Sequence, residues 1–249
     1  MQQTKLKMWT GVGTCLLTLA TSTLVSAQTT VKPLAAAPKT GYSAAADAKS
    51  EGGEGGEGGN KKPDFVSKIK GKELLTALRS GGYVIFFRHA QTEKDYADQA
   101  DPKLDLNNCA TQRALNDKGI EQAKSIGVAF KEANIPVGLV LASDYCRAWK
   151  TADLAFGHYK RTPALNFVKA EEYTKAQKQQ MSRAITPLLA AKPVGKVNTV
   201  IVGHDDVFDA ATGIYPEPQG MAYILKPKGH GKFEILANMQ SGEWAMLPK

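Results

Sequence analysis

The chain has 249 residues, of which 43% are hydrophobic, and a formal net charge of +8. The length allows one domain with a full hydrophobic core. The lysines and arginines are dispersed and not clustered with aromatic residues, which argues against a nucleic-acid partner, while the positive charge favours the approach of anionic substrates.

The N-terminus predicts a secretory signal peptide over residues 1–27, with basic Lys5 and Lys7, an apolar core over residues 16–25 and a small-residue cleavage site ending at Ala27. A retained membrane anchor is the alternative. The threonines, serines and glycines of this segment make a poor spanning helix, so we expect cleavage and no stable membrane insertion of the mature protein. The protein is then exported, to the periplasm or outside the cell.

A composition change follows the signal peptide. Residues 28–62 are rich in alanine and proline, then in glutamate and glycine as a repeated triplet. Such a segment cannot bury a core, so we expect a disordered linker. Residues 63–249 remain as one globular domain.

Hydrophobic periodicity divides this domain into alternating elements. We expect helices over residues 64–79, 115–134, 145–156, 171–191 and 205–212, with Asn116 or Asp117 capping the second. We expect buried strands over residues 83–87, 138–143 and 198–203, and a closing antiparallel pair over residues 222–225 and 233–237. The alternation predicts an α/β fold, a three-layer sandwich whose central sheet is mostly parallel and covered by helices on both faces.

Basic residues follow each of the three buried strands. Arg88 and His89 end the first, Arg147 follows the second, and His204 follows the third. Open α/β sheets place their ligand sites at the carboxyl ends of strands. Two arginines and two histidines at such ends predict a pocket that binds phosphate and attacks it.

Three motifs carry a family resemblance. They are Arg88-His89-Ala90, the segment from Ser143 through Arg147 to Thr151-Ala152, and Gly203-His204. In this order they resemble the histidine phosphatase superfamily, which has the phosphoglycerate mutase-like fold, and the resemblance extends over residues 65–249. The chain departs from the family pattern at Gln91, where glutamate is common, and at Asp144, where a second serine is frequent.

The resemblance implies a role for each matched residue. Arg88 and Arg147 bind the phosphate, His89 is the nucleophile that becomes phosphohistidine, and His204 donates a hydrogen bond to the phosphoryl oxygens. No metal and no cofactor are implied. His158 and His230 are expected to be ordinary loop residues.

The proton donor for the leaving group stays open between two positions. Asp205 directly follows the second histidine, as in the acid phosphatase branch of the family. Glu171, or its neighbour Glu172, lies where the mutase branch has its acid. Adjacency favours Asp205, and the overall layout of the chain resembles the mutase branch. Either acid can instead be a helix cap.

Further residues are expected around the pocket. Thr92, Asn108 and Arg113 are possible substrate contacts, although a surface position suits Arg113 and Asn108 equally well. Other residues that can line the mouth are Asp206, Glu217 and Gln219. The variable segment over residues 93–103 is where we expect substrate specificity to reside.

The mature chain keeps two cysteines, Cys109 and Cys146. In an oxidising compartment such a pair is more often a disulfide than two reactive thiols. With no paired histidines at short spacing, a structural zinc site is not expected.

The sequence therefore predicts an exported phosphomonoesterase that acts on a small phosphorylated substrate through phosphohistidine. A mutase that passes the phosphate to a second hydroxyl is one alternative, which export argues against. A non-catalytic module that binds phosphate or polyanions is another.

Overall fold

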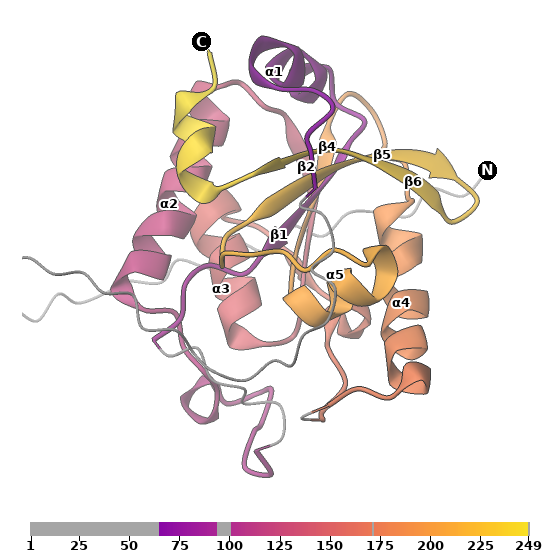
Figure 1. Ribbon diagram of the computed structural model, residues 1–249. Coiled ribbons are helices and arrows are strands. Elements are labelled where there is room, and N and C mark those ends of the chain that lie inside the picture. Colours follow the sequence, from indigo (N-terminus) through magenta and orange to yellow (C-terminus); the bar gives the residue numbers. More distant parts are fainter. Residues whose placement is uncertain (1–64, 94–100, 171, 249) are drawn as a thin grey trace, which may run out of the picture. The chain divides into compact units, whose positions relative to one another are not determined.

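The computed structural model describes residues 65–93, 101–170 and 172–248 (Figure 1). The expected signal peptide and linker, residues 1–62, lie outside the described residues. The first two residues of the expected domain, 63 and 64, also lie outside the described residues.

One sheet lies at the centre of the described domain. Its strands are β1 (Val84–Arg88), β2 (Val137–Ala142), β3 (Lys160–Arg161), β4 (Asn198–Gly203), β5 (Ala222–Gly229) and β6 (Lys232–Met239), in the order β3-β2-β4-β1-β5-β6. The pairs from β3 to β1 are parallel, whereas β5 pairs antiparallel with both β1 and β6. The predicted parallel core and the closing antiparallel pair are both confirmed, and the sheet as a whole is mixed.

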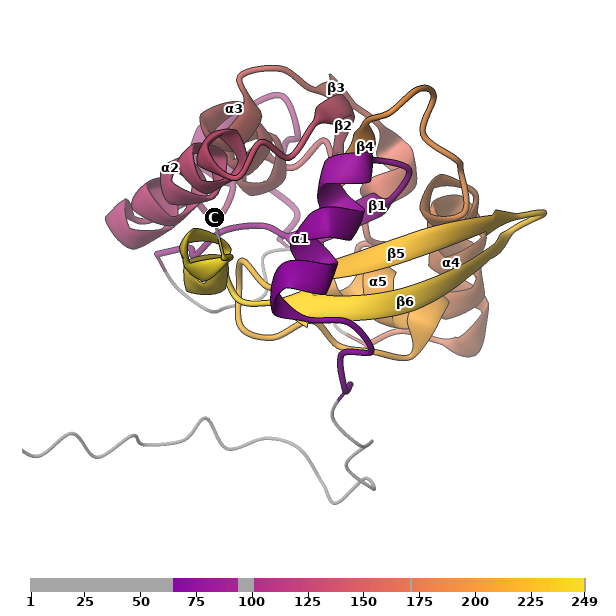
Figure 2. The same cartoon turned by 90° about the horizontal axis from the view of Figure 1, so that it is seen from above.

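Helices cover both faces of the sheet (Figures 1 and 2). They are α1 (Gly71–Ser80), α2 (Asp117–Glu132), α3 (Cys146–Phe156), α4 (Lys175–Leu189) and α5 (Asp205–Thr212), with the short 3₁₀ helices η1 (Cys109–Thr111), η2 (Pro163–Leu165) and η3 (Ser241–Met246). Side chains of α1, α2, α3 and η3 share one core cluster with the sheet. Side chains of α4 and α5 share a second cluster on the opposite face. The predicted three-layer α/β architecture is confirmed.

Strand β1 is buried along its whole length and separates the two clusters. Ile85 and Phe87 face α1, α2 and α3, whereas Val84 and Phe86 face α4 and α5. The ring of Phe86 stacks on that of Phe208, with centroids 4.3 Å apart. A strand that packs on both sides holds the residues at its end in a well-defined position.

The first helix is shorter than predicted. It begins at Gly71, because the preceding backbone bonds to the sheet: the N–H groups of Lys68 and Ile69 both donate to the carbonyl of Leu236 in β6. The ring of Phe65 meets that of Tyr223 at 5.8 Å. The apolar spacing before residue 71 therefore reflects contacts with the sheet and not a helix face.

Helix boundaries elsewhere follow their capping residues. Asn116 accepts a hydrogen bond from the N–H of Gly119 and caps α2, as one of the two predicted caps. The fourth helix begins at Lys175 and not at residue 171, because Thr174 and Gln177 form a capping box there. The prediction missed η3, whose Trp244 is buried among the residues of the first cluster.

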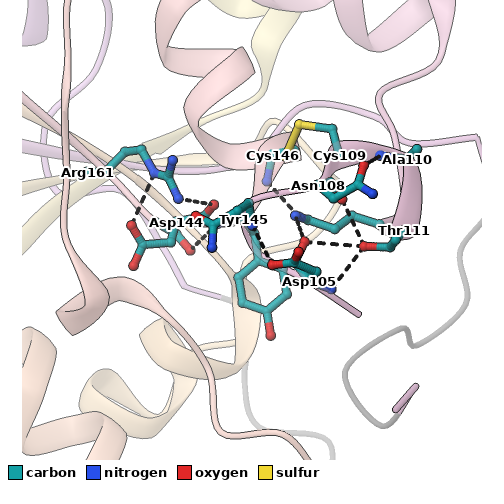
Figure 3. Close-up of a disulfide and its surroundings, with 12 residues drawn as sticks. Asp105, Asn108, Cys109, Ala110, Thr111, Asp144, Tyr145, Cys146 and Arg161 are labelled. Atoms are coloured by element: carbon teal, nitrogen blue, oxygen red, sulfur yellow. Dashed lines mark hydrogen bonds and ion pairs between the residues drawn. A yellow bond between two sulfur atoms is a disulfide. The ribbon is translucent and has the colours of Figure 1, made fainter. Parts of the chain in front are cut away.

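The two cysteines form the expected disulfide (Figure 3). It joins Cys109, the first residue of η1, to Cys146, the first residue of α3, with Cα atoms 5.7 Å apart. The side chain of Gln112 adds a hydrogen bond at the same junction, accepting from the N–H of Cys146 at 2.8 Å. Closing a loop of this length stabilises the fold by roughly 3–4 kcal/mol in the chain-entropy model. The bridge therefore anchors η1 beside Arg147.

Candidate active site

Three parallel strands bring the four predicted residues together at one edge of the sheet. Arg88 ends β1, His89 follows it, Arg147 lies in the first turn of α3, and His204 follows β4. Their side chains are almost fully buried, with both histidines at 0%, Arg147 at 2% and Arg88 at 4% exposure. Buried charges in one place need an anion or an ion pair to offset their desolvation.

The ring of His89 is held in one tautomer. Its Nδ1 lies 2.8 Å from the carbonyl oxygen of Ala90, which can only accept, so Nδ1 carries the proton. Its Nε2 accepts from Nε of Arg147 at 3.2 Å and lies 3.5 Å from Nη2 of Arg113. Burial, followed by the charge of Arg147, holds the pKa of His89 well below 6.5. Nε2 is therefore unprotonated, and its lone pair faces the guanidinium groups of Arg147 and Arg113.

The ring of His204 is held by a relay of two polar side chains. Ser143 donates its hydroxyl proton to Oδ1 of Asn166 at 2.8 Å, so its oxygen accepts from Nε2 of His204 at 2.9 Å. The ring lies edge-on to that of His89, with centroids 5.4 Å apart. Burial, followed by the charge of Arg147, lowers the pKa of His204 well below 6.5.

Two buried nitrogen atoms of this pocket have no hydrogen-bond partner in the described part of the chain. They are Nδ1 of His204 and Nε of Arg88. An unsatisfied buried nitrogen is costly, and it is rare unless a ligand or water completes it. Nε of Arg88 can donate to a phosphoryl oxygen as it stands. Nδ1 of His204 can do so once the ring takes up a second proton, which a bound anion favours, so both atoms fit an oxyanion site.

Arg88 also contacts the candidate acid. Its Nη2 lies 2.6 Å from Oδ2 of Asp205, and its Nη1 donates to the carbonyl of Pro216 at 3.2 Å. The hydroxyl of Tyr215 donates to the same carboxylate oxygen at 2.6 Å. Asp205 thus lies beside Arg88, on the side of the loop that follows α5.

Asp206, the next residue, is in a different environment. Its Oδ2 accepts from the hydroxyl of Tyr173 at 3.1 Å. Burial, followed by the charge of Asp205, raises the pKa of Asp206 to about 6. It is not among the residues that line the cavity next to Arg88, whereas Glu217 and Gln219, the other two expected mouth residues, do line it.

The remaining predicted contacts separate into three groups. Arg113 lies in the pocket through its approach to His89, and Thr92 lines the adjoining cavity. Asn108 instead caps η1, accepting from the N–H of Ala110. Glu172 is exposed, while Glu171 and most of the variable segment, residues 94–100, lie outside the described residues.

The other two histidines lie in loops, as predicted. The ring nitrogens of His158 lie 3.0 Å from the carbonyl oxygens of Phe156 and Gly138, so this ring joins two pieces of backbone. His230 occupies the turn between β5 and β6 with a positive φ of 51°. Neither histidine lies among the residues of the pocket.

Sequence reasoning assigned no role to three residues of the site. Ser143 was visible in the family motif, but its hydrogen bond to His204 needed the fold. Asn166 and Tyr215 carry no sequence signal, because their partners Ser143 and Asp205 are joined to them by tertiary contacts.

Replacing Arg147 by lysine is expected to lower kcat/KM by about 10²-fold or more. The guanidinium carbon lies 4.9 Å from the ring centre of Tyr145 and 5.4 Å from that of Phe167, so the group is stacked as well as charged. Lysine keeps the charge but loses the fork and the stacking. Steady-state kinetics check this, with Arg183→Lys as control, since Arg183 is exposed on α4. Near-normal kinetics for Arg147→Lys would mean that another residue binds the phosphate.

The free energy of unfolding is expected to decrease as the pH falls below 6.5. The pKa values of His89 and His204 are lowered in the folded state, so below pH 6.5 the unfolded chain binds more protons than the folded chain. Each histidine then lowers the free energy of unfolding by about 1.4 kcal/mol for each pH unit of acidification. The raised pKa of Asp206, about 6, acts in the opposite sense and offsets part of the loss. Urea denaturation at about pH 7.5 and about pH 5.5 measures the difference. His204→Asn should reduce it, and equal stability at both pH values would contradict the assignment.

The family model of the histidine phosphatase superfamily (branch 1) matches residues 84–166. Over these 83 residues the chain is similar to the histidine phosphatase superfamily, which supports a phosphatase. The matched segment contains β1 with Arg88 and His89, and α3 with Arg147.

Several solved structures are similar to this chain. The alpha-ribazole phosphatase from Shigella flexneri is 18% identical, with a TM-score of 0.44, and the alignment covers 61% of this chain and 94% of that one. The protein histidine phosphatase SixA complexed with tungstate is 15% identical, with a TM-score of 0.45 and coverages of 65% and 98%. A phosphoserine phosphatase from Entamoeba histolytica, in complex with 3-phosphoglyceric acid, is 15% identical, with a TM-score of 0.46 and coverages of 64% and 98%. A comparison with curated proteins finds no match for this chain.

Proposed function

We propose that this protein is an exported phosphomonoesterase that hydrolyses small phosphate monoesters through a phosphohistidine on His89. The observation that carries the proposal is the environment of His89 Nε2. The hydrogen bond from Nδ1 to the carbonyl of Ala90 keeps the proton on Nδ1, so Nε2 carries the lone pair. Nε2 lies within 3.5 Å of nitrogen atoms of Arg147 and Arg113. A nucleophile and the groups that hold a phosphate are therefore adjacent.

The reaction follows from this geometry in two displacements. The Nε2 lone pair attacks phosphorus and forms an N–P bond while the bond between phosphorus and the ester oxygen breaks. The leaving alkoxide takes a proton from the general acid. Water then attacks the phosphorus of the phosphohistidine and gives a proton to the carboxylate that the general acid has become. The N–P bond breaks with its electron pair returning to Nε2, and inorganic phosphate leaves with the water oxygen. Arg88 and Arg147 neutralise the phosphoryl charge in both steps.

Asp205 is the acid we favour for the first step. In the free protein its carboxylate is shared between Arg88 and Tyr215. A bound phosphate competes for Arg88 and leaves the carboxyl group of Asp205 beside the ester, where it can face the leaving oxygen. Glu171 and Glu172 are the alternatives at the mutase-like position.

The test of the function is phosphate release by the purified mature protein. Turnover of p-nitrophenyl phosphate with stoichiometric free phosphate supports the phosphatase. Transfer of the phosphate to a second hydroxyl of the substrate, without release, would indicate the mutase. Binding of phosphate without any turnover would indicate the non-catalytic module.

Export and the oxidising compartment are part of the same proposal. The disulfide between Cys109 and Cys146 supports it, because such bridges persist outside the cytosol. Within the described ranges, none of the helices has the length and apolarity that crossing a membrane requires. Sequencing the N-terminus of protein recovered from the export compartment tests the expected cleavage after Ala27.

A further inference from the structure

A cavity of about 480 Å³ adjoins the phosphate pocket, and Arg88 belongs to both. The cavity lies between the segment that follows β1 and the loop that precedes β5. Its lining includes Arg88, Glu93, Asn116, Gln122, Glu217 and Gln219. Because a phosphate held by Arg88 must place its ester group beside it, this cavity is positioned to receive the leaving group.

The amide side chains of the wall are committed to backbone groups. Gln122 accepts from the N–H of Gln91 at 3.0 Å and donates to the carbonyl of Gln219 at 3.1 Å. The side chain of Gln219 accepts from the N–H of Thr92 at 2.8 Å. These bonds tie the segment after β1 to the loop before β5, so the wall is preorganised.

Asn116 is committed in the same way. Its Oδ1 caps α2, and its Nδ2 donates to the carbonyl of Thr92 at 2.9 Å. Three of the amides therefore hold the wall together, which leaves the exposed side chain of Gln91 and the ionic groups of the cavity to distinguish ligands.

Those ionic groups are one arginine and two carboxylates. The Nε of Arg88, whose side chain is 5% exposed, has no hydrogen-bond partner in the described part of the chain. Glu93 and Glu217 are exposed, and neither has an ion-pair partner among the described residues. The cavity thus offers a cation at the phosphate side and two anions further out.

We propose that this cavity is a leaving-group subsite that selects phosphate monoesters of amino alcohols, with Glu93 and Glu217 binding the ammonium group. The inference rests on the proposed function, since it names the substrate class of the same site. Arg88 takes the phosphate, and the two carboxylates attract a cation and repel a second anion at the other end of the ester. Esters whose alcohol carries a carboxylate are correspondingly disfavoured.

A matched pair of esters tests the subsite. O-Phosphoethanolamine and 2-phosphoglycolate have the same two-carbon chain and differ in ending with an ammonium or a carboxylate group. For the unaltered protein we expect kcat/KM to favour the ammonium ester by about tenfold, from two partly exposed charge interactions whose sign reverses between the esters. In the double variant Glu93→Gln/Glu217→Gln the ratio should fall close to one.

The ratio cancels changes that affect both esters equally, so a general loss of activity does not mimic the effect. Glu73→Gln, on the exposed side of α1, removes a carboxylate away from the cavity and should leave the ratio unchanged. A ratio at or below one in the unaltered protein overturns the proposal, as does a tenfold ratio that persists in the double variant.

A binding measurement separates this inference from the proposed function. If p-nitrophenyl phosphate is not hydrolysed, the phosphatase proposal fails, and the affinities of the two esters for the unaltered protein are then compared by calorimetry. A preference for O-phosphoethanolamine that disappears in the double variant supports the subsite even then. Equal affinities for the two esters refute it.

Discussion

Replacing His89 by alanine is expected to lower kcat by at least about 10⁴-fold, because no other group takes over the attack on phosphorus. Inorganic phosphate or vanadate should still bind weakly, through Arg88 and Arg147. Quenching the unaltered protein with alkali during turnover should trap a phosphoenzyme that is stable in base and is lost on acid treatment, as a phosphoramidate bond is. The variant should yield none.

His158→Ala is the matched control for this prediction. The ring of His158 contacts the carbonyls of Phe156 and Gly138 and lies in a loop, so its loss can affect stability but should leave the phosphoenzyme intact. Activity that survives in His89→Ala would refute the nucleophile assignment. An acid-stable phosphoserine in the trapped protein would do the same.

Removing the general acid is expected to slow alkyl phosphates far more than p-nitrophenyl phosphate. A nitrophenolate leaves without a proton, whereas the alkoxide of a sugar or of glycerol does not. General acid catalysis contributes about 10²–10⁴-fold, so Asp205→Asn should lose a factor of that order on glycerol phosphate and little on p-nitrophenyl phosphate. The ratio of kcat/KM for the two substrates measures the effect.

The competing acids are tested in the same assay. Glu171→Gln and Glu172→Gln should leave the ratio unchanged, and so should Asp206→Asn, whose partner is Tyr173. Equal losses on both substrates for Asp205→Asn would mean that it serves only to hold Arg88. A selective loss for Glu171→Gln or Glu172→Gln would move the acid to the mutase-like position.

Much of the fold followed from local patterns in the sequence. Three elements were recognisable in the sequence: β1, β4 and α5. Each is bounded by glycine or polar residues, and its apolar residues follow the pattern of a buried strand or of a helix face. The order of the arginines and histidines after these strands led to the pocket. That step depends on one rule of parallel sheets, that carboxyl ends of neighbouring strands meet at one edge.

The parts that sequence reasoning missed depend on tertiary contacts. The start of α1 was misjudged because the carbonyl of Leu236, far along the chain, accepts the hydrogen bonds of Lys68 and Ile69. The relay from Asn166 through Ser143 to His204 joins three separate segments. The cavity beside Arg88 depends on amides whose partners lie on other loops. No periodicity reports such pairings.

The pocket draws on distant parts of the chain, and this links catalysis to folding. Arg147 contacts His89 across 58 positions of sequence, and His204 contacts Ser143 across 61. The site is therefore assembled from segments that lie far apart in the sequence. Contacts between such distant segments form slowly during folding. Enzyme activity is therefore a direct readout of the folded population: a chain that has made its helices but not joined β1 to β4 has all the residues of the candidate site and no assembled pocket.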